Sequence, residues 1–449
     1  MPRRELKDWL TPLLCGLLLR AWMVHHFALV SGDGLLYGRI AINWLQHGVY
    51  GFATAPLRPT LIRLPGYAIF LAAVFKLFGT GNYAAVLRLQ SVVDVATCAL
   101  VALFVRHFAS RRAALAALWL GVLCPFTASY VVVPLTETLS IFCVALAMLA
   151  AAHCDREDCS RPLWLLLLAF ALSYAILLRP DGGLLAAVVI PYLLVRAWQR
   201  RSALAMRRLV AVSLLALLPL VPWTLRNYRV FHVFQPLAPR YANDPAEPDE
   251  AGYKSWVKTW FVDSASNEEF YWCADDCPLD INLLPSRAFD SPQQREQTAA
   301  LLNAENNAGV ITPQLDAQFA ALAHARAGEH PLRAHVLLPM ARLADMLLRP
   351  RTELFPVPSR WWEFRAHART SWFALAYAAL NLAYLLLAGV GFLRRRVPLA
   401  PMLLAYVALR CALLLTVENS EPRYTLEFFP IVFAAAACAL FINKTEVAK

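Results

Sequence analysis

The chain has 449 residues, of which 59% are hydrophobic and 16% are charged. Water-soluble domains carry about 45–50% apolar and about 25% charged residues, so this composition excludes an ordinary soluble protein and indicates one that crosses a membrane several times. The net charge of +11 is unevenly distributed. Residues 226–370 contain 15 Lys and Arg against 18 Asp and Glu, and the rest of the chain contains 27 against 13. Because the excess basic residues belong to the membrane part, no nucleic-acid partner is expected.

Ten apolar segments are predicted to be membrane-spanning helices. They lie near residues 9–30, 83–105, 113–132, 134–152, 162–178, 182–197, 209–225, 372–393, 397–417 and 426–442. The first has no small-residue cleavage motif behind it, so it is predicted to be a retained signal-anchor helix. A further apolar run, Leu64–Phe78, is only about four helical turns long. It opens with Pro65 and Gly66, so it is predicted to be an interfacial or half-inserted helix.

Lys and Arg in short loops predict the sidedness of these spans, because such residues favour the cytoplasmic side. With ten spans, the basic residues at both termini and after spans two, six and eight all fall on one side. They are Arg3, Arg4, Lys7, Arg106, Arg111, Arg112, Arg200, Arg201, Arg207, Arg208, Arg394, Arg395, Arg396, Lys444 and Lys449. Both termini are therefore predicted to be cytoplasmic, and the loop 31–82 and the segment 226–370 are predicted to be extracytoplasmic.

The predicted fold is an all-α polytopic membrane protein with a mainly helical extracytoplasmic domain between spans seven and eight. We predict an N-terminal membrane module over 1–225, the extracytoplasmic domain over 226–370 and C-terminal membrane helices over 371–449. Within the domain, the Ala, Leu and Gln content of 291–306 and 312–328 favours helices.

Two cysteines in this domain differ from the others, most of which lie in spans as expected of buried structural thiols. Cys273 and Cys277 would face an oxidising compartment, so a small-loop disulfide is the first interpretation. Two free thiols are the alternative, and a metal site that uses Asp275 and Asp276 is another.

Charged and aromatic residues gather at helix ends on the predicted extracytoplasmic side. The group comprises Asp33, Arg63, Glu137, Arg179, Asp181, Arg226, Tyr228, Arg229, Glu418, Glu421, Arg423 and Tyr424. Arginine binds phosphate through bidentate, permanently charged donors, and a carboxylate can accept a proton from an attacking hydroxyl. Together these residue types favour transfer of a group linked to a lipid phosphate. Arginine would stabilise the departing phosphate, and Asp33 would deprotonate the acceptor.

Each of these residues also has a structural interpretation. The arginines could extend to lipid headgroups from span ends. Asp33 lies between two glycines, which is typical of a turn, and Glu137 could be a first-turn acid favoured by the helix dipole. Tyr37 could belong to the packing face of a short helix.

The first loop resembles that of GT-C fold glycosyltransferases. The matching residues are Asp33, Tyr37, Ala41, Asn43-Trp-Leu and Gly48, then Arg63-Leu-Pro-Gly-Tyr. Further matching pieces are Leu178-Arg-Pro-Asp-Gly, Pro222-Trp-Thr-Leu-Arg-Asn-Tyr-Arg and Glu421-Pro-Arg-Tyr. The most similar groups are bacterial relatives of protein O-mannosyltransferases, of lipid A aminoarabinose transferase and of lipopolysaccharide-core transferases. The resemblance covers the membrane part and not the domain between spans seven and eight.

This resemblance implies an inverting glycosyltransferase of a bacterial plasma membrane. It would move a sugar from a polyprenyl-phosphate donor to an extracytoplasmic lipid, glycan or protein. Asp33 maps to the family's catalytic base and Arg63 to its contact with the donor phosphate. Many members carry two adjacent acids where this chain has Asp33-Gly34, so the need for a divalent metal stays open.

The complete set of site predictions combines the resemblance with the clustering at helix ends. Asp33 and Glu137 are the catalytic candidates. The candidates for binding the donor phosphate are Arg63, Arg179, Arg226 and Arg423. The candidates for binding the substrate are Tyr37, Tyr228, Glu421 and Tyr424.

Two other classes of protein remain as alternatives. A transporter or flippase for a lipid-linked saccharide would place charges or broken helices at mid-membrane, and here Asp94 is the main such charge. A non-catalytic scaffold would use the membrane part only to present the segment 226–370.

Overall fold

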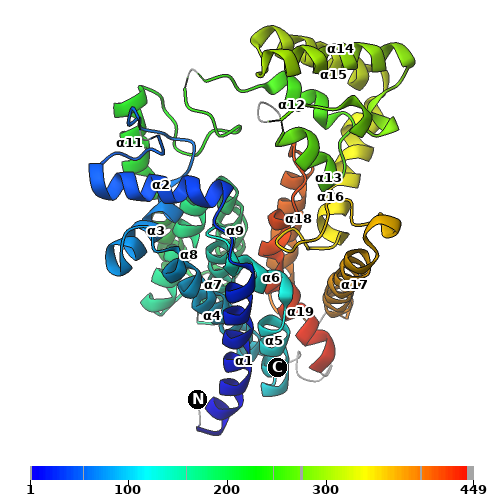
Figure 1. Cartoon of the computed structure of the whole chain (residues 1–449). Coiled ribbons are helices and arrows are strands. Elements are labelled where there is room, and N and C mark those ends of the chain that lie inside the picture. Colours follow the sequence, from blue (N-terminus) through cyan, green and yellow to red (C-terminus); the bar gives the residue numbers. More distant parts are fainter. Residues whose placement is uncertain are drawn as a thin grey trace. The chain divides into compact units, whose positions relative to one another are not determined.

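The computed structural model describes residues 3–53, 55–157, 159–245, 247–273, 277–394 and 397–441, and every regular element in these ranges is a helix (Figure 1). The chain divides into two units. The first comprises Met1–Pro245, Leu382–Leu409 and Leu426–Lys449, and the second comprises Ala246–Asn381 and Arg410–Thr425. The second unit thus begins after the predicted boundary at Arg226, and the predicted division into three parts stays a prediction.

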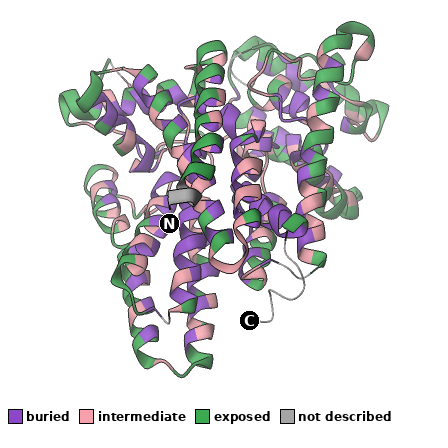
Figure 2. Ribbon diagram, turned by 90° about the horizontal axis from the view of Figure 1, so that it is seen from below, coloured by how far each residue is buried: buried purple, intermediate pink, exposed green. Residues whose placement is uncertain are grey.

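The first unit is a bundle around the buried helix α7. Its elements are α1 (Arg3–Phe27), α2 (Gly32–His47), α3 (Pro65–Phe78), α4 (Tyr83–Phe108), α5 (Arg111–Val122), α6 (Pro125–Ser129), η1 (Tyr130–Val132), α7 (Glu137–Arg156), α8 (Pro162–Leu178), η2 (Pro180–Gly182), α9 (Gly183–Gln199), α10 (Ala203–Leu217), α11 (Leu220–Phe231) and α19 (Phe429–Phe441). In the most apolar stretch of α7, 89% of the residues are buried, against 22% in the helix over Ala203–Phe231. Figure 2 shows helices that are buried along one side and exposed along the other, as expected of a bundle whose outer helices face lipid.

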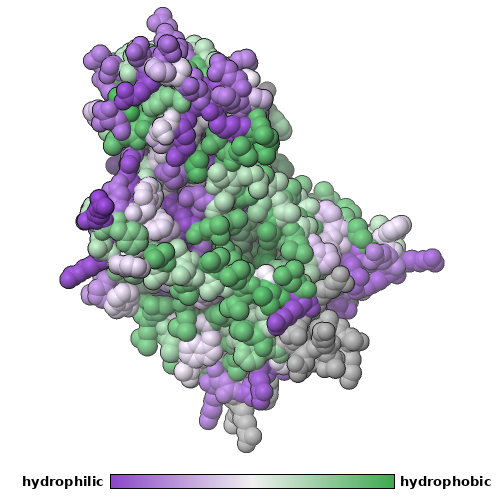
Figure 3. Space-filling view, turned by 90° about the vertical axis from the view of Figure 1, so that its right-hand side faces the viewer, coloured by the Kyte–Doolittle hydropathy of each residue, from purple (hydrophilic) through white to green (hydrophobic). Residues whose placement is uncertain are grey.

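Six helices among the described residues are long and apolar enough to cross a membrane. They are Tyr83–Phe108, Glu137–Arg156, Pro180–Gln199, Ala203–Phe231, Phe364–Leu393 and Pro422–Phe441. The number rises to eight if two bent helix pairs, at predicted spans one and three, each count as one span. Predicted spans five and nine coincide with shorter apolar helices, Pro162–Leu178 and Ala400–Leu414. Figure 3 shows a broad hydrophobic area on one face of the molecule. The all-α multipass fold is therefore confirmed, and the count of ten stays a prediction.

A buried ion pair satisfies a backbone carbonyl at the break in the third predicted span. The helix α5 ends at Val122 and bends by 41° into the next segment, which begins at Pro125, because proline cannot continue the hydrogen bonding of the preceding turn. Arg20 of α1 donates to the freed Val122 carbonyl at 2.6 Å and to Asp94 at 2.8 Å. The Arg20 and Asp94 side chains are only 0% and 1% exposed. Asp94 is therefore neutralised inside the bundle.

The second unit has its own aromatic core. Its elements are α12 (Ala251–Lys258), α13 (Ser264–Ser266), η3 (Asn267–Tyr271), η4 (Ile281–Leu283), η5 (Ser286–Ala288), α14 (Pro292–Ala308), α15 (Pro313–Glu329), η6 (Arg333–Leu337) and α16 (Leu338–Leu348). Three further elements have residues in both units, namely α17 (Phe364–Leu393), α18 (Ala400–Leu414) and η7 (Pro422–Phe428). Trp256, Trp260 and Phe319 are fully buried where α12 packs on α15.

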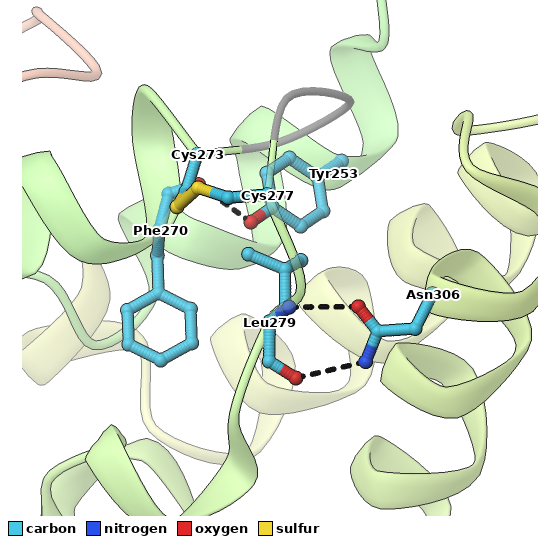
Figure 4. The surroundings of a disulfide bond; sticks show 6 residues. All are labelled: Tyr253, Phe270, Cys273, Cys277, Leu279 and Asn306. Atoms are coloured by element: carbon cyan, nitrogen blue, oxygen red, sulfur yellow. Dashed lines mark hydrogen bonds between the residues drawn. A yellow bond between two sulfur atoms is a disulfide. The ribbon is translucent and has the colours of Figure 1, made fainter.

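The predicted disulfide between Cys273 and Cys277 is present beside this core (Figure 4). Next to it, the Tyr253 hydroxyl donates to the Phe270 carbonyl at 2.8 Å. The alternative metal ligands of the sequence analysis, residues 275 and 276, lie outside the described residues.

Asp263 is expected to make the stability of the second unit depend on acid pH. Burial alone would raise the pKa of Asp263, but hydrogen bonds from the Ser266 amide and hydroxyl and the Arg287 guanidinium outweigh burial, so its pKa lies below the usual value. The stabilisation is therefore present above the unfolded pKa of about 3.9 and is lost as the pH falls through the folded value. We expect Asp263→Asn to cost about 1–2 kcal/mol at pH 7 and progressively less in acid.

Tryptophan fluorescence during unfolding at a series of pH values measures this difference. Glu296→Gln, at an exposed position of α14, controls for removing a charge. An equal difference between wild type and Asp263→Asn at pH 3 and pH 7 would contradict the assignment.

Candidate active site

Two glycines let distant segments of the first unit meet. A side chain at Gly34 in α2 would lie 2.6 Å from the ring of Pro134, just before α7. A side chain at Gly66 in α3 would lie 2.6 Å from the backbone of Leu177, at the end of α8. Both contacts are closer than any β-carbon tolerates, so these positions require glycine. The start of α2 is thus held against the start of α7, and the start of α3 against the end of α8.

Asp33 and Arg63 form the first ion pair of the site. Asp33 lies in the first turn of α2, where the helix dipole favours a carboxylate, and not in a turn between two glycines as one interpretation had it. Arg63 Nη2 donates to Asp33 Oδ1 at 2.7 Å. The side chains are 22% and 30% exposed, respectively, so a substrate can reach both partners.

Glu137 and Arg179 form the second ion pair. Glu137 opens α7, and Arg179 follows the end of α8. Arg179 Nη1 donates to Glu137 Oε1 at 3.1 Å, and Arg179 Nε donates to Asp181 Oδ1 at 3.0 Å. The Glu137 side chain is only 2% exposed, so this carboxylate is far less accessible than Asp33.

The buried Tyr37 lies near both ion pairs. It interacts electrostatically with both partners of each pair, and the Arg63 guanidinium lies 5.9 Å from the centre of its ring. Tyr37 also packs edge-on against Tyr67, whose hydroxyl donates to Gln90 at 2.6 Å. The four charged residues of the two ion pairs therefore all lie near Tyr37, which is itself a predicted site residue. Tyr37 therefore packs α2 against α3, and its predicted role in binding the substrate stays a prediction.

These two ion pairs are suited to binding an anion, because an anion could replace the carboxylate that each arginine now binds. Each guanidinium is already held in place by a carboxylate, and arginine can bind a phosphate through two parallel hydrogen bonds. A phosphate that enters could therefore replace a carboxylate on Arg63 or Arg179 without reorganising the helices. The displaced carboxylate would then be available to accept a proton.

A metal site is not evident in this group. Among the described residues, the one cluster of His, Cys, Asp and Glu with ligand atoms within 4.8 Å of one another is Asp290, Glu329 and His330 in the second unit. Glu329 and His330 are exposed, and Asp290 is already bonded to Arg333 and paired with Arg326.

Arg226 holds the loop that carries Arg63, and its predicted contact with the donor phosphate stays a prediction. Its Nη1 donates to the Thr60 carbonyl at 2.7 Å and its Nη2 to the Tyr50 carbonyl at 3.0 Å. The guanidinium also lies 5.3 Å from the ring centres of Tyr50 and Trp223. These contacts fix both ends of the loop segment 50–60 onto α11.

Replacing Arg226 by lysine is expected to loosen this loop. A lysine ammonium cannot reproduce the planar fork to two carbonyls or its stacking on the rings. The loss of about 1.5 kcal/mol would speed hydrogen exchange at the amides of Thr60 and Leu61 roughly tenfold. Hydrogen-exchange mass spectrometry of the ligand-free protein measures this, with Arg229→Lys, at an exposed position of the same helix, as the control. Unchanged exchange in Arg226→Lys would mean that Arg226 has no role in holding the loop.

For the remaining predicted site residues, the role in binding the substrate or the phosphate stays a prediction. Tyr228 is 58% exposed on α11. Glu421, Arg423 and Tyr424 belong to the second unit, where Glu421 Oε1 accepts from Arg423 at 3.1 Å and from the Tyr424 hydroxyl at 2.9 Å. They form a local cluster of their own at the start of η7.

Sequence reasoning missed several residues that position the site. The Tyr50 hydroxyl donates to the carbonyls of Arg63 and Leu64, and Asp244 accepts from the Leu61 amide at 2.8 Å. These partners are backbone groups, which no side-chain pattern marks. The available signal was the pair of glycines, Gly34 and Gly66, each in the first turn of its helix.

The helical bundle with charged residues at its helix ends has the fold of the GT-C membrane glycosyltransferases, as the sequence resemblance predicted. Residues 58–225 match the family described as dolichyl-phosphate-mannose-protein mannosyltransferase. No curated protein matches the chain.

Among solved structures, the chain is similar to the archaeal oligosaccharyltransferase AglB from Archaeoglobus fulgidus, solved in complex with an inhibitory peptide and a dolichol-phosphate. The TM-score is 0.52 at 14% identity, over 98% of this chain and 50% of that one. The chain thus spans about half the length of that enzyme. ArnT from Cupriavidus metallidurans also matches, in the apo state (TM-score 0.40, 15% identity, 96% and 77% coverage) and bound to undecaprenyl phosphate (0.41, 16%, 96% and 76%).

Proposed function

We propose that this chain is an inverting glycosyltransferase that moves a sugar from a polyprenyl-phosphate donor to an extracytoplasmic acceptor. The observation that carries the proposal is the pairing of Asp33 with Arg63 and of Glu137 with Arg179 around Tyr37. Two arginines with exchangeable carboxylate partners suit a phosphate, and an accessible carboxylate suits a base.

In the proposed reaction, Asp33 is the base and Arg63 stabilises the leaving group. The donor phosphate replaces Asp33 on the Arg63 guanidinium. The Asp33 carboxylate, displaced from Arg63, accepts the proton of the acceptor hydroxyl, whose oxygen forms a bond to the anomeric carbon. The bond from that carbon to the phosphate oxygen breaks, and polyprenyl phosphate leaves with the electron pair, stabilised by Arg63 and Arg179.

Exposure separates the roles of the two carboxylates. Asp33 is 30% exposed and Glu137 is 2% exposed, so Asp33 is the one that an acceptor can reach. Glu137 then acts through Arg179, as a positioning residue. We propose the same kind of role for Arg226, which orients the loop that carries Arg63.

An apolar groove beside Arg179 is suited to the prenyl chain of the donor. It has a volume of about 510 Å³ and begins at Pro180, the residue that follows Arg179. It continues along α9 and α10, past Ala187, Ile190 and Leu217. A lipid whose phosphate binds Arg179 could place its chain here without exposing it to water.

The transporter alternative receives little support from the buried charges. Asp94 is paired with Arg20 and closes a break between helices, which accounts for a charge inside the bundle without any transported ion or sugar.

The proposed function can be tested with the full chain reconstituted in phospholipid vesicles. Synthetic polyprenyl-phosphate sugars are supplied together with a cell-envelope extract as acceptor. We expect free polyprenyl phosphate and a covalently glycosylated product, both measured by mass spectrometry. Movement of the intact lipid-linked sugar across the bilayer without any covalent product would contradict the proposal and favour a flippase.

A further inference from the structure

Helix α16 of the second unit turns its apolar side outward. Its outward residues, together with the last residue of η6, are Leu337, Met340, Ala344 and Leu348, and each of the three larger ones is more than half exposed. The two charged residues between them face the other way. Arg342 is fully buried and donates to the carbonyls of Lys258 and Phe261 at 2.9 and 3.2 Å, and Asp345 is only partly exposed.

Helix α14 of the same unit has the opposite pattern. The outward residues of α14 include Gln293, Arg295, Glu296 and Gln297, while Leu301 and Leu302 are buried in the aromatic core. That is the pattern of a helix that faces water. The outward face of α16 carries no charge between Leu337 and Leu348, so it is not suited to water.

Helix α17 indicates the depth at which α16 ends. Trp372 is exposed near the start of α17, as expected of a residue at a membrane–water interface. Asn381 lies nine residues further on, which is about 13 Å along the helix. Asn381 Nδ2 donates to the carbonyl of Leu347, in the last turn of α16, at 2.7 Å. The end of α16 therefore lies beside a part of the span that is expected to be in the hydrocarbon region.

The turn that follows α16 is buried by protein, as is expected of irregular backbone in the hydrocarbon region of a membrane. Irregular backbone is tolerated there only where protein buries it. Arg349, Arg351 and Thr352 are all less than 10% exposed. Arg351 binds Asn381 at 3.2 Å, the Pro422 carbonyl at 2.8 Å and the Thr425 hydroxyl at 2.6 Å.

We propose that Leu337, Met340, Ala344 and Leu348 form a lipid-contact surface through which the second unit is inserted into the membrane interface. The helix α16 lies with its charged side against the protein and its apolar side against lipid, and it is deepest at Leu348. This is the arrangement of an interfacial amphipathic helix. The inference is independent of the proposed glycosyl transfer, since it concerns only what the outward face of α16 contacts.

Site-directed spin labelling tests this proposal on the full chain in phosphatidylethanolamine–phosphatidylglycerol vesicles. Ala344→Cys carries the label on the proposed lipid surface, and Ala321→Cys, at an exposed position of α15, is the matched control. Met340→Cys and Leu348→Cys extend the series along α16. The wild-type protein, with its native cysteines, gives the labelling background. The measured quantities are the collision rates of each label with oxygen, which concentrates in lipid, and with a water-soluble nickel complex.

At Ala344 we expect severalfold more relaxation by oxygen than by the nickel complex, with the reverse at Ala321. The ratio should rise from Met340 to Leu348. Equal access of the nickel complex to labels at Ala344 and Ala321 would overturn the proposal, because the face would then be in water. A label at Ala344 that neither reagent reaches would also overturn it, because another protein surface would then cover the face.

Discussion

Asp33→Asn is expected to abolish most sugar transfer while leaving the protein folded and able to bind polyprenyl phosphate. The side chain keeps its size and can still pair with Arg63, but an amide cannot accept the proton of an acceptor hydroxyl. Removing a general base typically costs about 10²–10⁴-fold in rate. Since the Arg63 side chain is itself 22% exposed, the substitution leaves no fully buried charge uncompensated. The rate of polyprenyl phosphate release from a lipid-linked sugar measures the effect.

Two controls separate loss of the base from a general effect of removing charge. Glu296→Gln, in the second unit, removes an exposed carboxylate and should transfer at the wild-type rate. Binding of polyprenyl phosphate to Asp33→Asn should match or exceed that of the wild type, because the phosphate no longer competes with a carboxylate for Arg63. Near-wild-type transfer by Asp33→Asn would show that another group accepts the proton.

Arg20→Leu is expected to be among the most destabilising substitutions in the first unit. It would leave Asp94 buried without a countercharge and would remove the donor to the Val122 carbonyl at the end of α5. Breaking one partner of a buried ion pair costs about 3–5 kcal/mol. Thermal unfolding in detergent micelles, followed by circular dichroism, should show a much lower midpoint than that of the wild type.

The double variant Arg20→Leu/Asp94→Leu tests the cause of that loss. If the cost arises from an uncompensated charge, removing the carboxylate as well should recover most of the stability. A residual loss is expected, because the carbonyls of Gly121 and Val122 near the bend still lack the Arg20 donor. A double variant as unstable as Arg20→Leu would mean that the guanidinium acts through these carbonyls and not through Asp94.

Much of the candidate site could be predicted because its chemistry depends on residue types at helix ends. Asp33, Arg63, Glu137 and Arg179 are charged residues beside apolar runs, and the cost of such charges near a membrane marks them as functional candidates. That these four residues would lie close together could be predicted only in general terms, from their position at helix ends. The contacts that produce it occur at Gly34 and Gly66, whose close packing depends on the backbone of other helices.

The parts that could not be predicted involve partners without a side-chain signature. Arg226 has the same residue type and the same helix-end position as Arg179, yet it bonds to the carbonyls of Thr60 and Tyr50. Asp94 was recognisable as an exception inside a span, but its partner Arg20 lies 74 residues away on another helix. The outward apolar side of α16 became visible only once the burial of Arg342 was known.

An experimental structure of the full chain with bound polyprenyl phosphate would test the proposed site most directly. We predict that the phosphate oxygens lie about 3 Å from the guanidinium nitrogens of Arg63 or Arg179, with Asp33 released from Arg63 and facing the space left for the sugar. A phosphate bound elsewhere, with both Asp33–Arg63 and Glu137–Arg179 intact, would contradict the proposed site.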